Sequence, residues 1–138
     1  IIRIAIAGSP QSGKTTLSKV LNLNTKHTDD LIHLGWSEAS EKISHSWIDD
    51  NTIQIIEGVA VPRALRKWLK NNLTGKPVDK VIYLNNPYIK LTKGQQAMAK
   101  GCRTVWDEIK PELTKRGVIV EDNIIKTKRV EKIWTSTM

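Results

Sequence analysis

Apolar residues along the chain form short, β-branched runs that alternate with longer segments of helical periodicity. The first run, Ile1–Ala7, is apolar at nearly every position, which is typical of a strand buried on both faces of a parallel sheet. Similar runs follow at intervals along the chain. Together they predict five strands, at residues 1–7, 25–30, 52–58, 78–84 and 118–120.

The segments between these runs repeat their apolar residues at the spacing of a helix. They predict helices from about residue 13 to residues 22–24, from Ser37 to Asp49, from Pro62 to Leu73, and from Tyr88 to Arg116. The third of these helices is expected to bury Leu65, Trp68, Leu69 and Leu73, and to expose Arg66, Lys67 and Lys70 to water. The fourth is expected to be interrupted at Gly94, Gly101 and Pro111.

Strands that alternate with helices predict an α/β, doubly wound fold around a parallel sheet of about five strands. The 138 residues suffice for one domain, residues 1–138. In such sheets ligands bind at the carboxyl ends of the strands. The groups expected there are the segment that starts at Gly8, the pair Asp29-Asp30, the pair Glu57-Gly58, and Asn85-Asn86.

The segment Gly8–Thr15 reads Gly-Ser-Pro-Gln-Ser-Gly-Lys-Thr and fits G-x-x-x-x-G-K-[ST], the phosphate-binding P-loop. Glycines let the backbone approach a phosphate closely, and the loop amides and the following helix N-terminus attract the anion. Lys14 would reach the β- and γ-phosphates of a nucleoside triphosphate, and the Thr15 hydroxyl would coordinate Mg²⁺. The predicted cofactor-binding residues are Gly8, Ser9, Pro10, Gln11, Ser12, Gly13, Lys14, Thr15 and Thr16.

Acidic residues follow the second and third predicted strands. In an extended segment Asp29 and Asp30 point to opposite sides, so one of them, with Asp30 preferred, is expected to accept a proton from an acceptor hydroxyl or to hold Mg²⁺ through water. Glu57 is expected to support the metal site beside Lys14. The simpler alternatives remain open: a turn-forming acid pair for the first, and a strand-end acid paired with a lysine for the second.

Basic residues supply the other candidate catalytic groups. Arg63, at the start of a helix just after Glu57, suits bidentate contact with a phosphate. Residues 88–116 resemble a closing lid that carries Lys93, Lys100 and Arg103 toward the transferring phosphoryl group, although a plain basic helix would show the same pattern. His27, His33 and His45 lack the spacing of a metal site and are assigned structural roles.

The composition limits the class of protein further. The formal charge is +8, and residues 63–103 alone hold ten Lys and Arg residues against one Asp. That surplus suits an anionic partner such as nucleotide phosphates or a nucleic-acid end, but a solvated basic face is the more ordinary explanation. Cys102 is the single cysteine, so a reduced, cytoplasmic protein without an intrachain disulfide or zinc cluster is expected. No apolar run has the length of a membrane span.

These motifs together resemble the small P-loop kinases, the nucleoside and nucleotide kinase superfamily that also includes shikimate and gluconate kinase-like proteins and polynucleotide 5′-kinases. Thr28-Asp29-Asp30-Leu31 is similar to the acidic step of uridine kinase-like and polynucleotide kinase-like members, where an Asp is the base. Glu57-Gly58, followed by Pro62-Arg63, is similar to strand ends of uridine kinase-like and adenylate kinase-like members. The chain also resembles short P-loop proteins of bacteriophages.

The resemblance covers about residues 1–120 and implies a three-layer α/β/α P-loop NTPase fold with the P-loop strand in the sheet centre. Between Asp30 and Thr52, where nucleotide kinases hold their acceptor, Lys42 is the only lysine or arginine. The predicted function is therefore an ATP- and Mg²⁺-dependent phosphotransferase with a small nucleoside- or nucleotide-like acceptor. The alternatives are a regulatory P-loop ATPase or nucleotide-binding module, and a polynucleotide 5′-kinase.

Overall fold

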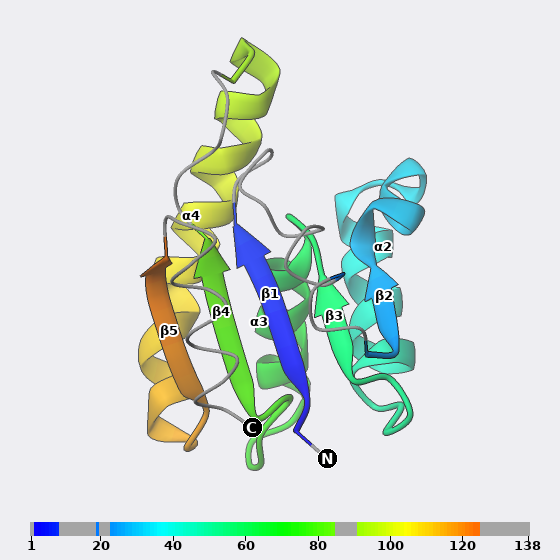
Figure 1. Cartoon of the computed structure of the whole chain (residues 1–138), viewed down its shortest axis with the longest axis vertical. Coiled ribbons are helices and arrows are strands. Elements are labelled where there is room, and N and C mark those ends of the chain that lie inside the picture. The colour runs from blue at the N-terminus through cyan, green and yellow to red at the C-terminus, as the bar shows by residue number, and fades with distance from the viewer. Residues whose placement is uncertain (1, 9–18, 20–22, 85–90, 125–138) are drawn as a thin grey trace.

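Five parallel strands form the centre of the molecule in the computed structural model, which describes residues 2–8, 19, 23–84 and 91–124 (Figure 1). The sheet order is β2-β3-β1-β4-β5, so the first strand of the chain lies in the middle. The strands are β1 (Ile4–Gly8), β2 (Thr25–His27), β3 (Ile55–Glu57), β4 (Lys80–Leu84) and β5 (Ile119–Ile124). The predicted α/β class with a five-stranded parallel sheet is confirmed.

Two long helices, α3 (Val61–Asn71) and α4 (Lys93–Lys115), cover one face of the sheet (Figure 1). A 3₁₀ helix (Thr28–Leu34), the short helix α2 (Trp36–Lys42) and a π-helical turn (Ile43–Trp47) connect β2 to β3. The second half of this connection packs against α3. Most of the helix predicted after the P-loop lies outside the described residues.

The apolar run of β1 is buried on both faces, as its composition predicts. Ala5 and Ala7 belong to the core cluster formed with α3 and α4, whereas Ile4 and Ile6 belong to a second cluster on the opposite face. In the first cluster the Trp106 ring of α4 stacks on Tyr83 of β4, with ring centroids 5.1 Å apart. This stacking fixes α4 against the centre of the sheet.

A partly buried arginine organises the amino-terminal end of the sheet. The Arg3 guanidinium donates to the carbonyl oxygens of Ile53, Pro77, Trp47 and Asp50, at 3.0–3.3 Å. These carbonyls belong to the connections that lead into β3 and β4. One planar side chain therefore ties together the loops at the end of the sheet opposite the strand carboxyl ends.

Several sequence-based boundaries are corrected by the structure. Helix α3 ends at Asn71 because Asn72 is extended, so Leu73, which was expected to be buried, is 87% exposed. Helix α2 begins at Trp36 rather than Ser37, after Gly35 with a φ of 91°. The predicted interruptions at Gly94, Gly101 and Pro111 are also wrong, because α4 runs unbroken through all three.

Among the described residues, no helix is both long and apolar enough to cross a lipid bilayer.

Candidate functional site

The carboxyl ends of β1, β3 and β2, which are adjacent in the sheet, lie side by side at one edge. Glu57 at the end of β3 pairs with Ile6 of β1 on one side and with His27 of β2 on the other. Strand β1 then ends at Gly8, the first residue of the predicted P-loop, where φ is 151°. Glycine adopts this positive φ more readily than other residues. Gly8, the first residue of the motif, therefore suits the turn by which the chain leaves the sheet.

Glu57 is a buried carboxylate, with its side chain only 3% exposed. Its Oε1 atom is hydrogen-bonded to Nδ1 of His27, whose side chain is 37% exposed. The adjacent strands place the two side chains side by side, because His27 and Glu57 are direct register partners. His27 therefore helps to hold this acid in place. The structural role that the sequence assigned to His27 is thus exercised at the candidate site itself.

The turn after Glu57 packs tightly on the turn after His27. Gly58 has a φ of 145°, and a Cβ atom there would lie 1.7 Å from Oγ1 of Thr28. Its amide donates to the carbonyl of Ile6 at 3.0 Å. Thr28 is fully buried, and its hydroxyl lacks a hydrogen-bond partner in the structure. Only glycine fits at position 58, so the ends of β1, β2 and β3 are joined without a side chain between them.

Asp29 and Asp30 lie in the 3₁₀ helix that follows Thr28, and both are exposed. The extended segment predicted for them is wrong, because β2 ends at His27. Successive residues of a 3₁₀ helix are about 120° apart, so the two carboxylates are not forced to opposite sides. The choice between them as base therefore stays a prediction.

Arg63 occupies a cage built from three helices. Its Cζ atom lies 4.6 Å from the centre of the Trp36 ring, at the start of α2. On another side, a Cβ atom at Gly101 of α4 would lie 2.8 Å from its Nη2 atom. Its Nη1 atom is buried and has no hydrogen-bond partner in the structure. A buried guanidinium donor without an acceptor is costly, so this cage is ready to receive an anionic oxygen.

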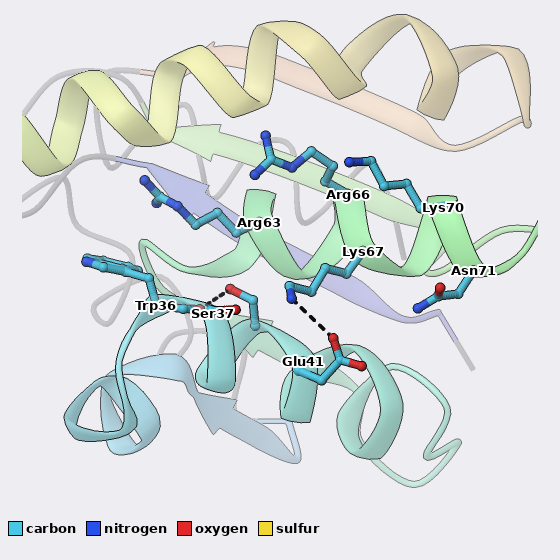
Figure 2. Close-up of a pocket in the computed structure, with 9 residues that line it drawn as sticks. Trp36, Ser37, Glu41, Arg63, Arg66, Lys67, Lys70 and Asn71 are labelled. Carbon is cyan, nitrogen blue, oxygen red and sulfur yellow. Dashed lines mark hydrogen bonds and ion pairs between the residues drawn. The ribbon is translucent and has the colours of Figure 1, made fainter.

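A groove of about 520 Å³ runs from this cage between α2 and α3 (Figure 2). Its basic wall is one side of α3, and its opposite wall is α2 with the Glu41 carboxylate. The lining residues are Trp36, Ser37, Ser40, Glu41, Arg63, Arg66, Lys67, Lys70 and Asn71. Arg66 and Lys67, which were expected to be exposed to water, have side chains that are 34% and 31% exposed within this groove.

Glu41 is hydrogen-bonded to both Lys67 and His45. The hydrogen bond from Lys67, and then the one with His45, hold the pKa of Glu41 below its ordinary value. The Lys67 Nζ to Glu41 Oε2 distance is 3.1 Å. Glu41 therefore neutralises part of the charge on the basic wall, at the side of the groove nearest Lys67.

Arg103, predicted to contact the transferring phosphate, lies on the other side of α4. It forms ion pairs with Asp107 and Asp122 at 3.2 and 3.3 Å, and its guanidinium lies 5.2 Å from the Tyr83 ring centre. Asp122, at the end of the sheet in β5, also accepts from Lys110 and from the Trp106 indole. A role for Arg103 on substrate would require it to leave two carboxylates.

The lid predicted over residues 88–116 is largely one continuous helix, with residues 88–90 outside the described part. From Cys102 onward it is packed on the sheet, and the Cys102 thiol donates to the carbonyl of Gly8 at 3.7 Å. The amino-terminal turns of α4 extend beyond the strand tips (Figure 1). Lys93 is the first residue of this helix, and Lys100 precedes Gly101 in it. The lid role of this segment stays a prediction.

The remaining site predictions fall on residues that the structure does not describe. They are Ser9, Pro10, Gln11, Ser12, Gly13, Lys14, Thr15 and Thr16 of the P-loop, and Asn85-Asn86 after β4. For the predicted metal site, the structure describes Glu57 and Asp30 but not Thr15. In the described part of the chain, no three His, Cys, Asp or Glu side chains cluster as metal ligands. Oxygen donors of this kind fit Mg²⁺, which keeps several of its waters.

Two features of the site escaped the sequence-based interpretation. His27 had a signal, its position immediately before the Thr28-Asp29-Asp30 step at the end of a strand. The basic wall of the groove had a weaker signal, four cations at helical spacing from Arg63 to Lys70. That pattern alone also describes a solvated helix face, and the difference depends on how closely α2 packs on α3.

Comparison with solved structures finds the same fold in shikimate kinases. The shikimate kinase of Acinetobacter baumannii, in complex with shikimate, superposes with a TM-score of 0.56 over 99% of this chain and 93% of its own, at 14% identity. The shikimate kinase of Bacteroides thetaiotaomicron gives a TM-score of 0.51 over 99% and 95%, at 18% identity. No protein-family model and no curated protein matches the sequence. At these identities the likeness establishes the fold.

Proposed function

We propose that this chain is an ATP-dependent phosphotransferase that moves the γ-phosphate of ATP to a hydroxyl group of a small acceptor. The observation that carries the proposal is the position of the sequence Gly8–Thr15. This segment begins at the end of the central strand β1, where Gly8 has a positive φ. The next strand ends with the buried Glu57 carboxylate, close to the Thr28–Asp30 turn. This is the strand-to-loop context in which the P-loop motif binds a triphosphate.

In this proposal the chain's own groups divide the chemistry among them. The amides of residues 8–16 and the Lys14 ammonium bind the triphosphate. Thr15 and Glu57 would hold Mg²⁺, which neutralises phosphate charge when bound, and Asp30 would join them through water if Asp29 is the base. The acceptor oxygen attacks the γ-phosphorus, its proton passes to the carboxylate of Asp30 or Asp29, and ADP leaves. Arg63 positions the acceptor from the other side of the site.

The structural likeness favours a small hydroxyl compound as acceptor. One of the matched enzymes is a shikimate kinase with shikimate bound, and it covers nearly the whole length of this chain. A nucleoside or nucleotide acceptor, or a nucleic-acid 5′ end, remains a finer prediction from the sequence. A regulatory module without an acceptor is less favoured, because the groove beside Arg63 supplies a candidate acceptor pocket.

The test is a screen for transfer of label from [γ-³²P]ATP, with magnesium, to pools of small hydroxyl compounds that include shikimate, sugars, nucleosides and nucleotides. We expect one pool to give a labelled product, and expect the variant Lys14→Ala to give none. Slow release of labelled phosphate without any labelled acceptor, across all pools, would contradict the proposal and favour an ATPase module.

A further inference from the structure

We propose that the groove between α2 and α3 binds a molecule with at least two anionic groups, about 10 Å apart, and that this molecule is the phosphoryl acceptor. The second half of this statement rests on the proposed function, whereas the first half stands on the groove itself. The position at the Arg63 end would hold the anion nearest the reacting hydroxyl. The position at the Lys70 end would hold a second, remote anion.

The charge of the groove is the first argument. Arg63, Arg66, Lys67 and Lys70 stand at positions i, i+3, i+4 and i+7 of α3, so their side chains leave the same side of the helix. All four line the groove, against one carboxylate, that of Glu41 (Figure 2). A concave site lined by one sign of charge concentrates counter-ions of the opposite sign.

The pairing of these cations is the second argument. Lys67 is matched by Glu41, and Arg66 lies 3.5 Å from Glu108, a carboxylate of α4 that is 56% exposed. Within the described part of the chain, neither Arg63 nor Lys70 pairs with a carboxylate. The two ends of the basic wall are therefore the places where negative charge is missing.

The Arg63 cage shows that one end is built to receive an oxygen atom. Its guanidinium is held by the Trp36 ring and by the space left at Gly101, and the buried Nη1 atom points at no acceptor. A side chain that merely solvated a helix surface would keep its donors in water. Here the donor is desolvated first, so a bound anion gains a charge-assisted hydrogen bond at little further cost.

The spacing sets the size of the ligand. Lys70 lies seven positions after Arg63, which corresponds to about 10 Å along a helix that rises about 1.5 Å per residue. The groove volume of about 520 Å³ lies within the range of small-molecule sites. A phosphorylated sugar or a dicarboxylate of about this length fits both measures. The common chemistry is two anionic oxygen clusters at the ends of a compact, polar body.

The test measures binding by calorimetry, with the phosphate loop first filled by a non-hydrolysable ATP analogue and magnesium. The probes are fructose 1,6-bisphosphate, fructose 6-phosphate, and the dicarboxylate suberate. We expect one of the two doubly anionic probes to bind about tenfold or more tightly than fructose 6-phosphate. The bisphosphate binding best would assign phosphate as the preferred anion, and suberate binding best would assign carboxylate.

Variants locate the binding on the groove. We expect Arg66→Gln/Lys70→Gln to weaken the tighter probe by about tenfold or more. The control Lys26→Gln/Lys115→Gln removes the same charge from exposed positions outside the groove and should leave binding within about twofold. Lys70→Gln alone, at an exposed residue, keeps the test valid if the double variant melts at a lower temperature.

The outcomes separate this inference from the proposed function. Equal affinity for all probes, or groove and control variants of equal affinity, would overturn the anion site whether or not the protein transfers phosphate. Tight, groove-dependent binding together with a failed labelling screen would keep the anion site and reject the acceptor role. If the screen finds an acceptor, its KM should rise in Arg66→Gln/Lys70→Gln, and an unchanged KM would contradict the inference.

Discussion

At the scale of single residues, the site depends on what glycine permits. Gly58 lets the turn after β3 lie directly against Thr28, so Glu57 is held between β1 and β2 with His27 bonded to it. Gly101 leaves space for the Arg63 guanidinium, and Gly8 ends β1 with a positive φ. Each of these positions brings backbone or a charged group closer to its neighbour than a Cβ atom would allow.

The variant Gly58→Ala tests this close packing. A Cβ atom at position 58 would overlap Oγ1 of Thr28, at 1.7 Å, in addition to straining the backbone. Gly35→Ala is the matched control, because Gly35 also has a positive φ, of 91°, but has no atom within 4 Å of its Cβ position. We expect Gly58→Ala to lower the free energy of unfolding by about 1–3 kcal/mol more than Gly35→Ala does.

Urea unfolding of both variants, followed by circular dichroism, gives the comparison. Equal losses in the two variants would show that backbone strain alone accounts for the effect and that Thr28 has room to move.

At the scale of elements, helix α4 has two parts with different roles. Its second part packs on the sheet through the stacked rings of Tyr83 and Trp106. In addition, the Asp122 carboxylate of β5 accepts hydrogen bonds from Arg103, Lys110 and the Trp106 indole. Its first part extends beyond the strand tips (Figure 1). Asp122 and the stacked rings therefore anchor the second part of α4 on the sheet.

The variant Asp122→Asn removes the charge from a side chain that is 8% exposed and holds two cations. We expect a loss of about 2 kcal/mol in the free energy of unfolding, because Arg103 and Lys110 then lose their shared buried partner. Asp107→Asn, at a carboxylate that is 56% exposed and also contacts Arg103, should cost less than about 0.5 kcal/mol.

Thermal or denaturant unfolding measures both variants. A loss at Asp107 as large as the loss at Asp122 would mean that the exposed ion pair, and not the buried carboxylate, anchors the helix.

At the scale of the whole molecule, the sequence was sufficient for the architecture but not for the groove. Continuous apolar runs such as Ile4–Ala7 predict buried parallel strands, because both faces must be covered, and the motif that starts at Gly8 then predicts which edge of the sheet carries the candidate site. The burial expected of Leu65 and Leu73 shows the limit: both fit one apolar stripe, but α3 ends before Leu73, so only Leu65 is buried. Local periodicity does not specify where a helix stops.

The same limit applies to the candidate site. Asp29 and Asp30 were correctly placed near the strand ends, but the 3₁₀ helix that carries them depends on the buried Thr28 and on the contact with Gly58. The groove depends on the packing of α2 against α3. These two helices are separated in the sequence by the π-helical turn and by β3. Contacts between elements, rather than propensities within them, decide these features.

The most direct measurement of the central claim is a calorimetric titration of the protein with ATP in the presence of Mg²⁺, for the wild type and for Lys14→Ala. The account predicts a saturable, roughly equimolar binding isotherm for the wild type, and a loss of affinity of about a hundredfold in the variant, with an unchanged melting temperature for the free protein. No binding heat in the wild type, or equal affinity in Lys14→Ala, would contradict it.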